Sequence, residues 1–187
     1  RQTPLENTNF RFTNLSGSKL PDSILTNNDF YSAELKNMDF GGKNLSNSIF
    51  SLADFEDTNM IEVNVEYSSF VDVDFSQIKN KSLKGANMDH GSFSYSSFVD
   101  VELPMKLEHV NFNKAKMNGV NFENRSIFGT LFQETNLNNA NFKDADLSAG
   151  AARTIIDYEP RLLELSTSDF VKEVFGPHPN VQLLDVN

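Results

Sequence analysis

Every fifth residue of this 187-residue chain is apolar over most of its length. The run of apolar fifth residues extends from Leu5 to Phe75, resumes at Leu83, resumes again at Leu107 and ends at Leu147. It comprises 29 central positions, although only 39% of the residues are hydrophobic, so chance does not explain it. A period of five matches neither an amphipathic helix, with a period of about 3.6, nor a strand, with a period of two.

The positions around each central residue follow the same period. The residue before it is Asp or Asn in 15 of the 29 repeats. The residue two before it is mostly small or β-branched, with exceptions at Asn28, Met38, Lys43, Lys81, Met105 and Arg125. A chain that points one large and one small side chain inward every five residues has to turn after each five. Four turns close a coil, and stacked coils pair their backbones and bury a continuous column, which is the arrangement of a solenoid.

The repeats at 140–144 and 145–149 read Ala-Asn-Phe-Lys-Asp and Ala-Asp-Leu-Ser-Ala. They resemble the pentapeptide-repeat proteins, whose consensus is A-(D/N)-L-x-x. The resemblance implies an all-β fold, a right-handed quadrilateral β-helix with four pentapeptides per coil and about seven coils over residues 1–147. Phe often replaces the consensus Leu, and this Phe-rich style is similar to that of bacterial effector members of the family.

Two breaks interrupt the period. Between Phe75 and Leu83 the chain carries three extra residues, and we expect segment 76–82 to bulge from the coil and expose Lys79 and Lys81. This bulge is either a contact loop or a tolerated surface insertion. The second break, between Leu103 and Leu107, drops one residue beside a proline, and we expect it to shift the register of the coil.

The two ends of the repeat differ. The period already runs at Leu5 without a recognisable cap, so we expect further residues or a partner to cover that end. Residues 148–187 lack the period and favour helices, because Pro160 suits a first helical turn and Ser168 a helix N-cap. We expect this segment to form a small helical C-terminal cap. The alternatives are a dimer contact, which leaves monomer and dimer open, and a linker to a following domain.

The composition and the motifs exclude most chemistry. The absence of Cys excludes a disulfide framework, a thiolate zinc site and a cysteine nucleophile. The three histidines, at 90, 109 and 178, have no partner spacing, and the common catalytic and phosphate-binding motifs are absent. We therefore predict no enzyme activity, no catalytic residue, no cofactor and no metal site.

The charge and the hydropathy restrict partners and location. The net charge of −10 disfavours direct binding of nucleic acid. No stretch approaches the roughly 20 apolar residues that a membrane helix needs. We expect a soluble protein of the bacterial cytoplasm, or one secreted into a host cell.

The acidic residues are concentrated, since no Lys or Arg lies between Asn44 and Ile78. Residues twenty apart stack in successive coils, which places Glu34, Asp54 and Asp74 in one column, partly compensated by Lys36. This column is either a solvated surface or a docking surface for a basic partner. The predicted protein-binding residues are Glu34, Asp54, Glu56, Asp57, Asp74, Lys79, Lys81 and Lys84.

The resemblance implies two functions. The first is a protein-interaction module, because in some effectors of pathogenic bacteria such a β-helix selects host proteins for a catalytic domain. The second is DNA mimicry, because some members of the family resemble B-DNA in width and charge, bind DNA gyrase and confer quinolone resistance. The interaction module is the preferred prediction, since the charge is modest and lysines such as Lys84 and Lys114 interrupt it.

Overall fold

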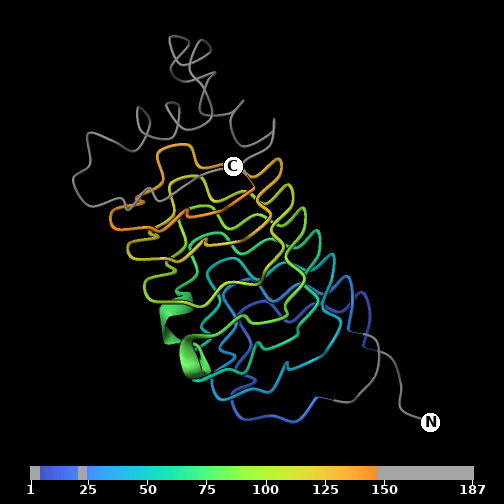
Figure 1. The fold of residues 1–187 in the computed structure, drawn as a ribbon. Helices are drawn as coiled ribbons and strands as arrows, with labels where there is room; N and C mark the ends of the chain where they lie inside the picture. Colours follow the sequence, from blue (N-terminus) through green and yellow to red (C-terminus); the bar gives the residue numbers. More distant parts are fainter. Residues whose placement is uncertain (1–4, 21–24, 147–187) are drawn as a thin grey trace.

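The computed structural model describes residues 5–20 and 25–146, which wind into a stack of square coils (Figure 1). Parallel β-bridges of single residues join successive coils, and most of them connect residues twenty apart, such as Asn9 with Asp29 and Asp29 with Ile49. Twenty residues per coil is four pentapeptides, which confirms the predicted quadrilateral β-helix. One side can be followed through seven coils, along Asn9, Asp29, Ile49, Ser69, Ser92, Asn111 and Leu131.

The Asp or Asn before each central residue has a local structural role. The side-chain Oδ1 of Asp29 accepts a hydrogen bond from the backbone N–H of Tyr31 at 3.0 Å, and Oδ1 of Asp54 accepts one from Glu56 at 3.1 Å. Where Asp or Asn is present, such Asx turns help to bend the chain at the corner. The residue two after the centre then takes a left-handed conformation, as at Asn27 with φ 59°, which explains why Asn is frequent there.

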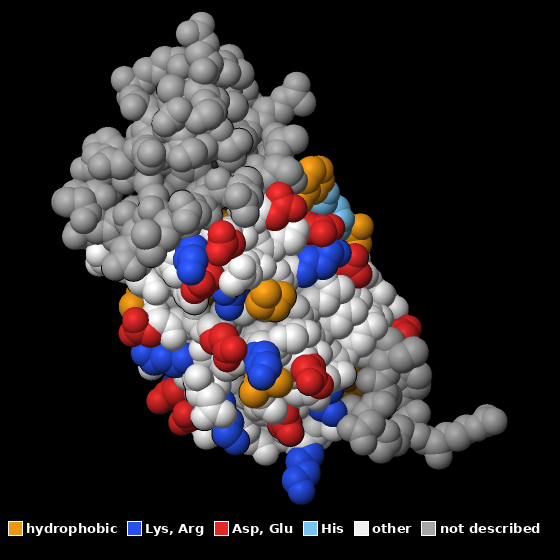
Figure 2. Space-filling model, in the orientation of Figure 1, with side chains coloured by type: hydrophobic (Ala, Val, Ile, Leu, Met, Phe, Trp, Pro, Cys, Tyr) orange, Lys and Arg blue, Asp and Glu red, His pale blue; other side chains and the backbone are white. Residues whose placement is uncertain are grey.

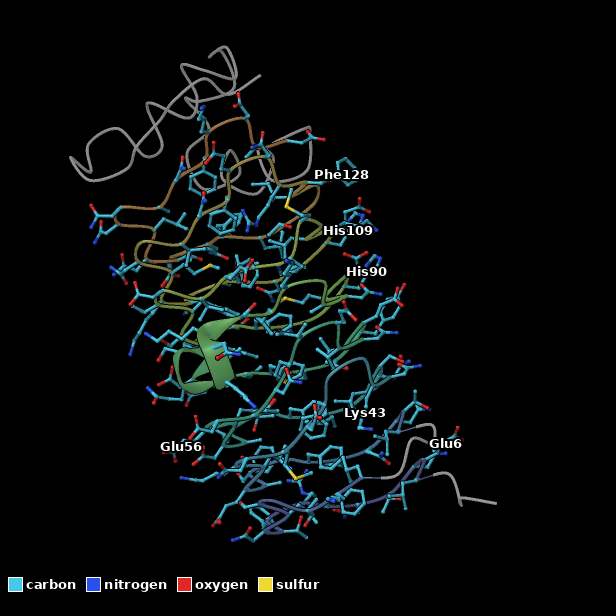
Figure 3. The ribbon with its side chains drawn as sticks, turned by 60° about the horizontal axis from the view of Figure 1, so that its bottom comes forward. Glu6, Lys43, Glu56, His90, His109 and Phe128 are labelled. Carbon is cyan, nitrogen blue, oxygen red and sulfur yellow. The ribbon has the colours of Figure 1, made fainter. Side chains whose placement is uncertain are left out.

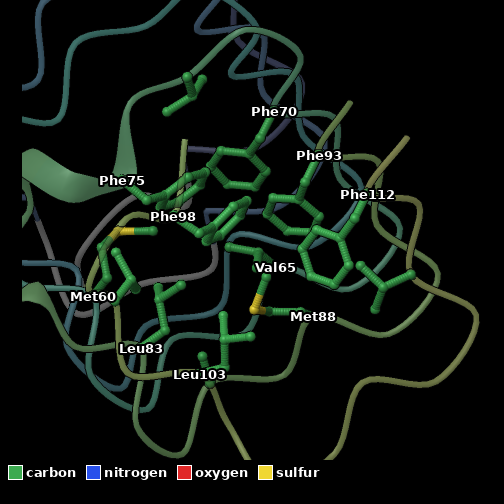
Figure 4. Close-up of a cluster of buried hydrophobic side chains, with 14 of the residues drawn as sticks. Met60, Val65, Phe70, Phe75, Leu83, Met88, Phe93, Phe98, Leu103 and Phe112 are labelled. Atoms are coloured by element: carbon green, nitrogen blue, oxygen red, sulfur yellow. The ribbon is translucent and has the colours of Figure 1, made fainter. Parts of the chain in front are cut away.

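The central residues form the core. From Leu25 to Phe142 every predicted central residue of the described chain is buried. We call one side of the coil the Phe side, because its central residues are all phenylalanine: Phe10, Phe30, Phe50, Phe70, Phe93, Phe112 and Phe132. From Phe10 to Phe93 their rings stack one per coil, with centroids 4.7 to 5.1 Å apart. Figure 4 shows Phe70 and Phe93 of this stack. Parallel coils therefore supply an aromatic column that adds to the burial of apolar area.

The inward residue two before each centre is often polar, and its polar groups form hydrogen bonds within the fold. The backbone N–H of Asn28 donates to Ser48 Oγ at 3.0 Å, and that of Ser48 donates to Ser68 Oγ at 3.1 Å. Thr58 Oγ1 donates to the backbone oxygen of Leu35 at 2.7 Å. Because each buried hydroxyl or amide bonds to a neighbouring coil, these residues hold the coils in register.

At the first break, bridges connect residues 23 apart, such as Ser69 with Ser92, which confirms three inserted residues. The insertion contains two short 3-10 helices, η1 (Phe75–Gln77) and η2 (Lys79–Lys81), at one edge of the stack (Figure 1). Ile78, between them, is buried, while Lys79 and Lys81 are exposed. The insertion therefore exposes its lysines as predicted, but it also adds an apolar side chain to the core.

At the second break, bridges connect residues 19 apart, such as Ser92 with Asn111, which confirms the predicted shift of register. The buried Arg125 stabilises it. Its guanidinium donates to the backbone oxygens of Leu103 at 3.0 Å and Pro104 at 3.1 Å. The pKa of Arg125 is lowered by burial. Arg125, which is not a small inward residue, thus gives hydrogen bonds to backbone carbonyls at the place where the chain drops a residue.

The expected C-terminal cap or linker, residues 148–187, lies outside the described residues, as does the last central position, Leu147. Within ranges 5–20 and 25–146, no helix has the length and apolar character needed to span a membrane.

Candidate protein-binding surface

The side after the Phe side carries the predicted acidic column, and we call it the acidic side. Bridges join Asn14 to Glu34 and Glu34 to Asp54. The central residues Phe55 and Phe75 stack with centroids 6.2 Å apart, which places Asp74 in the coil after Asp54. Glu34, Asp54 and Asp74 are all exposed, so the structure brings together the column that the period predicted.

Lys36 partly neutralises the acidic side. Its Nζ lies 2.7 Å from Glu56 Oε2 and 3.0 Å from Asp54 Oδ2. These two contacts, the hydrogen bond to Glu56 first, raise the pKa of Lys36 above its usual range. All three side chains remain partly exposed, so this ion cluster contributes little to stability but reduces the local negative charge.

A shallow hollow of about 310 Å³ lies where the acidic side meets the insertion. It is lined by Asn37, Met38, Asp39, Asp57, Asn59 and Lys79. The backbone N–H of Lys79 donates to Thr58 at 3.0 Å, and that of Asp57 donates to Gln77 at 2.9 Å, which ties the insertion to this corner. Predicted residues of both groups, Asp57 and Lys79, therefore border one concave surface.

Asp39, which the sequence analysis did not single out, is the most strongly held carboxylate of the hollow. Its Oδ1 accepts from the backbone N–H of Gly41 at 3.0 Å and from Asn59 Nδ2 at 2.8 Å. These two bonds, with smaller contributions from Lys43 and Lys79, keep the pKa of Asp39 below its usual value of 3.8. Asp39 thus stays ionised beside the inserted lysine. It precedes the centre at Phe40, so the period predicts its Asx turn, but its place in the hollow depends on the position of the insertion.

The other predicted residues take part in local contacts. Asp74 caps η1 by accepting from the backbone N–H of Ser76 at 3.0 Å. Lys81 Nζ lies 3.5 Å from Asp100 Oδ2, so it points to the next coil of the same corner. Lys84 is exposed after the insertion, on the side that follows. In Figure 3, Glu56 lies beside the 3-10 helices, which agrees with an acidic side adjoining the insertion.

A second exposed feature lies at the opposite edge of the molecule, where Figure 3 labels His90, His109 and Phe128. The rings of Tyr67 and His90 stack at 4.7 Å, and those of His90 and His109 at 4.8 Å. Phe128 meets His109 edge-on at 5.3 Å. We call these four residues the His corner. The expectation that the histidines have no partner spacing is wrong for His90 and His109, which lie 19 residues apart. Where the chain drops one residue, a full coil has 19 residues, so the two rings meet in successive coils.

Metal binding has no geometric basis in the part of the chain that the structure describes, where no three His, Asp or Glu side chains are grouped around a common point. On the face seen in Figure 2, acidic and basic side chains are interspersed, with apolar side chains among them. This arrangement offers protein contacts rather than a uniform field of one sign.

Comparison with known families decides the relationship. The family model for pentapeptide repeats matches residues 5–42, 44–77 and 128–149, with 8 copies, and so covers half of the chain. The chain belongs to the pentapeptide-repeat family. Its β-helix is therefore the right-handed type of that family. A comparison with curated proteins gives no match.

Several solved pentapeptide-repeat structures are similar. A trypsin-treated variant of QnrB1, a plasmid-mediated fluoroquinolone resistance protein, has 19% identity and a TM-score of 0.41, over 79% of this chain and 87% of that one. HetL, involved in heterocyst differentiation regulation in the cyanobacterium Nostoc, has 20% identity and a TM-score of 0.40, over 79% and 77%. A thylakoid-lumen protein from Arabidopsis thaliana has 22% identity and a TM-score of 0.34, over 73% and 69%.

Proposed function

We propose that this pentapeptide-repeat protein is a non-catalytic protein-interaction module that docks a basic partner on its acidic side, in the manner of the target-recognition β-helix of a bacterial effector. The observation that carries the proposal is that Asp57, at the corner beside the acidic column, and Lys79 of the insertion line one hollow. A concave surface on which two carboxylates, Asp39 and Asp57, outnumber one lysine can steer a basic partner and fix its orientation.

Three features support this assignment. The carboxylates of Asp54 and Asp74 fulfil an Asx role that asparagine fulfils elsewhere in the chain, so the fold itself does not require their charge. The insertion adds Lys79 to the rim, which gives the surface a mixed pattern that a specific partner can match. The β-helix is also rigid, because every coil bonds to the next through its backbone, so little ordering is needed on binding.

The alternative, a DNA mimic that binds DNA gyrase, receives less support. A DNA-like surface needs a continuous negative stripe along the rod. Here Lys36 lies between Asp54 and Glu56, and Lys81 and Lys84 follow within the next coil. Further along the acidic side, the residue that continues the column after Ser97 is Lys116. The negative charge is therefore confined to the N-terminal half of that side.

The test uses a variant that removes charge without altering the turns. Asp54→Asn, Asp57→Asn and Asp74→Asn are combined in one protein, since asparagine keeps the Asx bonds of positions 54 and 74 and accepts the left-handed conformation of position 57. The matched control combines Glu66→Gln, Glu108→Gln and Glu123→Gln, which removes the same charge from other surfaces. Each protein is crosslinked in bacterial and mammalian lysates, and the captured proteins are identified by mass spectrometry.

We expect a specific basic protein to be captured by the wild type and the control, and at least tenfold less of it by the acidic-side variant. Equal capture by all three proteins would contradict the proposed surface. Recovery of DNA gyrase, with inhibition of its supercoiling by the purified chain, would replace the proposed function with DNA mimicry.

A further inference from the structure

One apolar side chain per coil lines the corner between the Phe side and the acidic side. The five residues are Phe12, Tyr31, Leu52, Val71 and Tyr95, and we call them the apolar ridge. Backbone bonds place them in consecutive coils, because the N–H of Phe12 donates to Tyr31 and that of Leu52 to Val71, each at 3.0 Å. The rings of Phe12 and Tyr31 also pack edge-on at 5.6 Å.

The ridge is exposed and locally unfavourable. Phe12 is 70% exposed, Leu52 45% and Tyr95 53%. All three take left-handed φ values, 58°, 63° and 64°, which bulky side chains rarely adopt. At the same corner of the other coils the left-handed residue is polar: Ser32, Asp72, Lys114 and Glu134. Large apolar residues here gain little burial and add backbone strain, and strain kept without a folding benefit points to a function.

The acidic column runs directly beside the ridge. Leu52 is followed, after the buried Ala53, by Asp54, and Asp72 leads in the same way to Asp74. Cations mark the two ends of the ridge: Arg11 lies over the Tyr31 ring at 4.3 Å, and Lys114 Nζ lies 5.4 Å from the Tyr95 ring centroid. An apolar strip with a negative border along its middle suits a partner segment that has an apolar stripe and a positive flank.

The repeat distance selects the conformation of that segment. Successive coils lie about 4.8 Å apart, close to the 5.4 Å rise of one α-helical turn, so over four steps the two repeats drift by only about 2.5 Å. An extended strand repeats its side chains on one face about every 6.7 Å and drifts by roughly 8 Å over the same length. A helix therefore keeps one apolar side chain against each coil, whereas a strand does not.

We infer that the apolar ridge and the acidic column beside it bind an amphipathic helix of a partner protein, lying along the rod with its apolar stripe on the ridge and its Lys and Arg residues over Glu34, Asp54 and Asp74. The inference rests on the proposed function. It specifies that the basic partner binds through an amphipathic helix, and that this helix contacts the apolar ridge as well as the acidic column.

Synthetic peptides test the inference by fluorescence anisotropy. The first is an 18-residue helix with a leucine stripe and lysines on one flank. The second has the same sequence except for a central proline that breaks the helix. The third has glutamates in place of the lysines. The protein variants are Leu52→Asn with Tyr95→Asn, and the acidic-side variant described above. Tyr67→Asn is the matched control, since Tyr67 is an exposed aromatic residue with φ 56° at the His corner.

We expect the first peptide to bind the wild type and Tyr67→Asn equally, and the ridge variant at least tenfold more weakly. The proline and glutamate peptides bind the wild type at least tenfold more weakly than the first peptide. Undiminished binding to the ridge variant, equal binding of the proline peptide, or no binding of the first peptide overturns the inference. Loss of lysate capture in the acidic-side variant would in that case still support the proposed function, so the two failures are distinguishable.

Discussion

At the scale of single residues, the left-handed corner positions show which side chains suit the fold and which it only tolerates. Asn27 and Asn47 occupy the left-handed position with φ values of 59° and 57°, and asparagine accepts that conformation readily. Leu52 has the same conformation with φ 63° and an exposed side chain. At this corner leucine therefore adds only the partial burial of its side chain to what asparagine would provide.

Replacement of Leu52 by asparagine should leave the melting temperature unchanged or raise it. The change relieves backbone strain at a left-handed residue, and the lost side chain is 45% exposed, so little burial is forfeited. Thermal unfolding followed by circular dichroism measures the effect. Phe70→Ala is the contrasting control, because this fully buried ring of the Phe side should cost about 3–5 kcal/mol. A clear fall in melting temperature for Leu52→Asn would mean that the ridge is part of the core.

Asp39 gives a pH-dependent prediction. Its pKa in the folded chain is lowered, chiefly by the hydrogen bonds from Gly41 and Asn59, so its charge stabilises the fold above the unfolded value of 3.8. That contribution is lost as the pH falls through the lower folded pKa. Asp39→Asn should therefore unfold at lower urea concentration than the wild type at pH 5 to 7, and the difference should shrink below about pH 4. A difference that stays constant down to pH 2.5 would contradict the assignment.

At the scale of elements, the sequence predicts the coils and the places where they change. The apolar period identifies the buried centres, and its two breaks give the coils in which bridged residues lie 23 and 19 apart instead of 20. The period does not reveal how each break is stabilised. The burial of Ile78 and the bonds from Arg125 to the carbonyls of Leu103 and Pro104 depend on contacts across coils. Sequence alone marked Arg125 only as an exception among inward residues.

The candidate surfaces divide in the same way. The acidic column was predictable, because residues twenty apart stack and Glu34 and Asp54 share one phase. The apolar ridge and the His corner were not singled out, since aligning Leu52 with Tyr95, or His90 with His109, requires correcting the period for the breaks. Asp39 joined the hollow only through the position of the insertion. Which residues of distant coils lie side by side thus depends on the two breaks of the period.

Removal of the insertion tests its role as an element. Deletion of Ile78, Lys79 and Asn80, with Lys81→Ala, restores a five-residue spacing from Phe75 to Leu83 with a small inward residue. We expect a cooperative transition and an unchanged β-rich circular dichroism spectrum, because the β-helix is continuous on both sides of the break. Capture of the basic partner should fall, since the deletion removes the wall of the hollow that Lys79 forms. Collapse of the fold would show instead that the two 3-10 helices are structurally required.

At the scale of the whole molecule, a solenoid aligns equivalent positions, and this raises the cost of like charges. The chain carries a net charge of −10, and stacking sets carboxylates such as Glu34 and Asp54 in adjacent coils. Ion pairs offset part of this repulsion, for example Lys106 with Asp89 at 2.6 Å and Arg11 with Asp29 at 2.9 Å. Each includes a side chain that is substantially exposed, and such pairs contribute about 0–1 kcal/mol.

Repulsion should therefore outweigh attraction, and salt should stabilise the protein. Raising NaCl from about 20 mM to about 500 mM shortens the screening length from roughly 20 Å to about 4 Å, which weakens the repulsion between coils. We expect the melting temperature at pH 7 to rise by at least about 2 °C, since 1 kcal/mol corresponds to about 2–4 °C for a chain of this size. The acidic-side variant, with three fewer carboxylates, should show a smaller rise. A melting temperature that falls with salt would mean that the ion pairs, and not the aligned carboxylates, dominate the electrostatics of the rod.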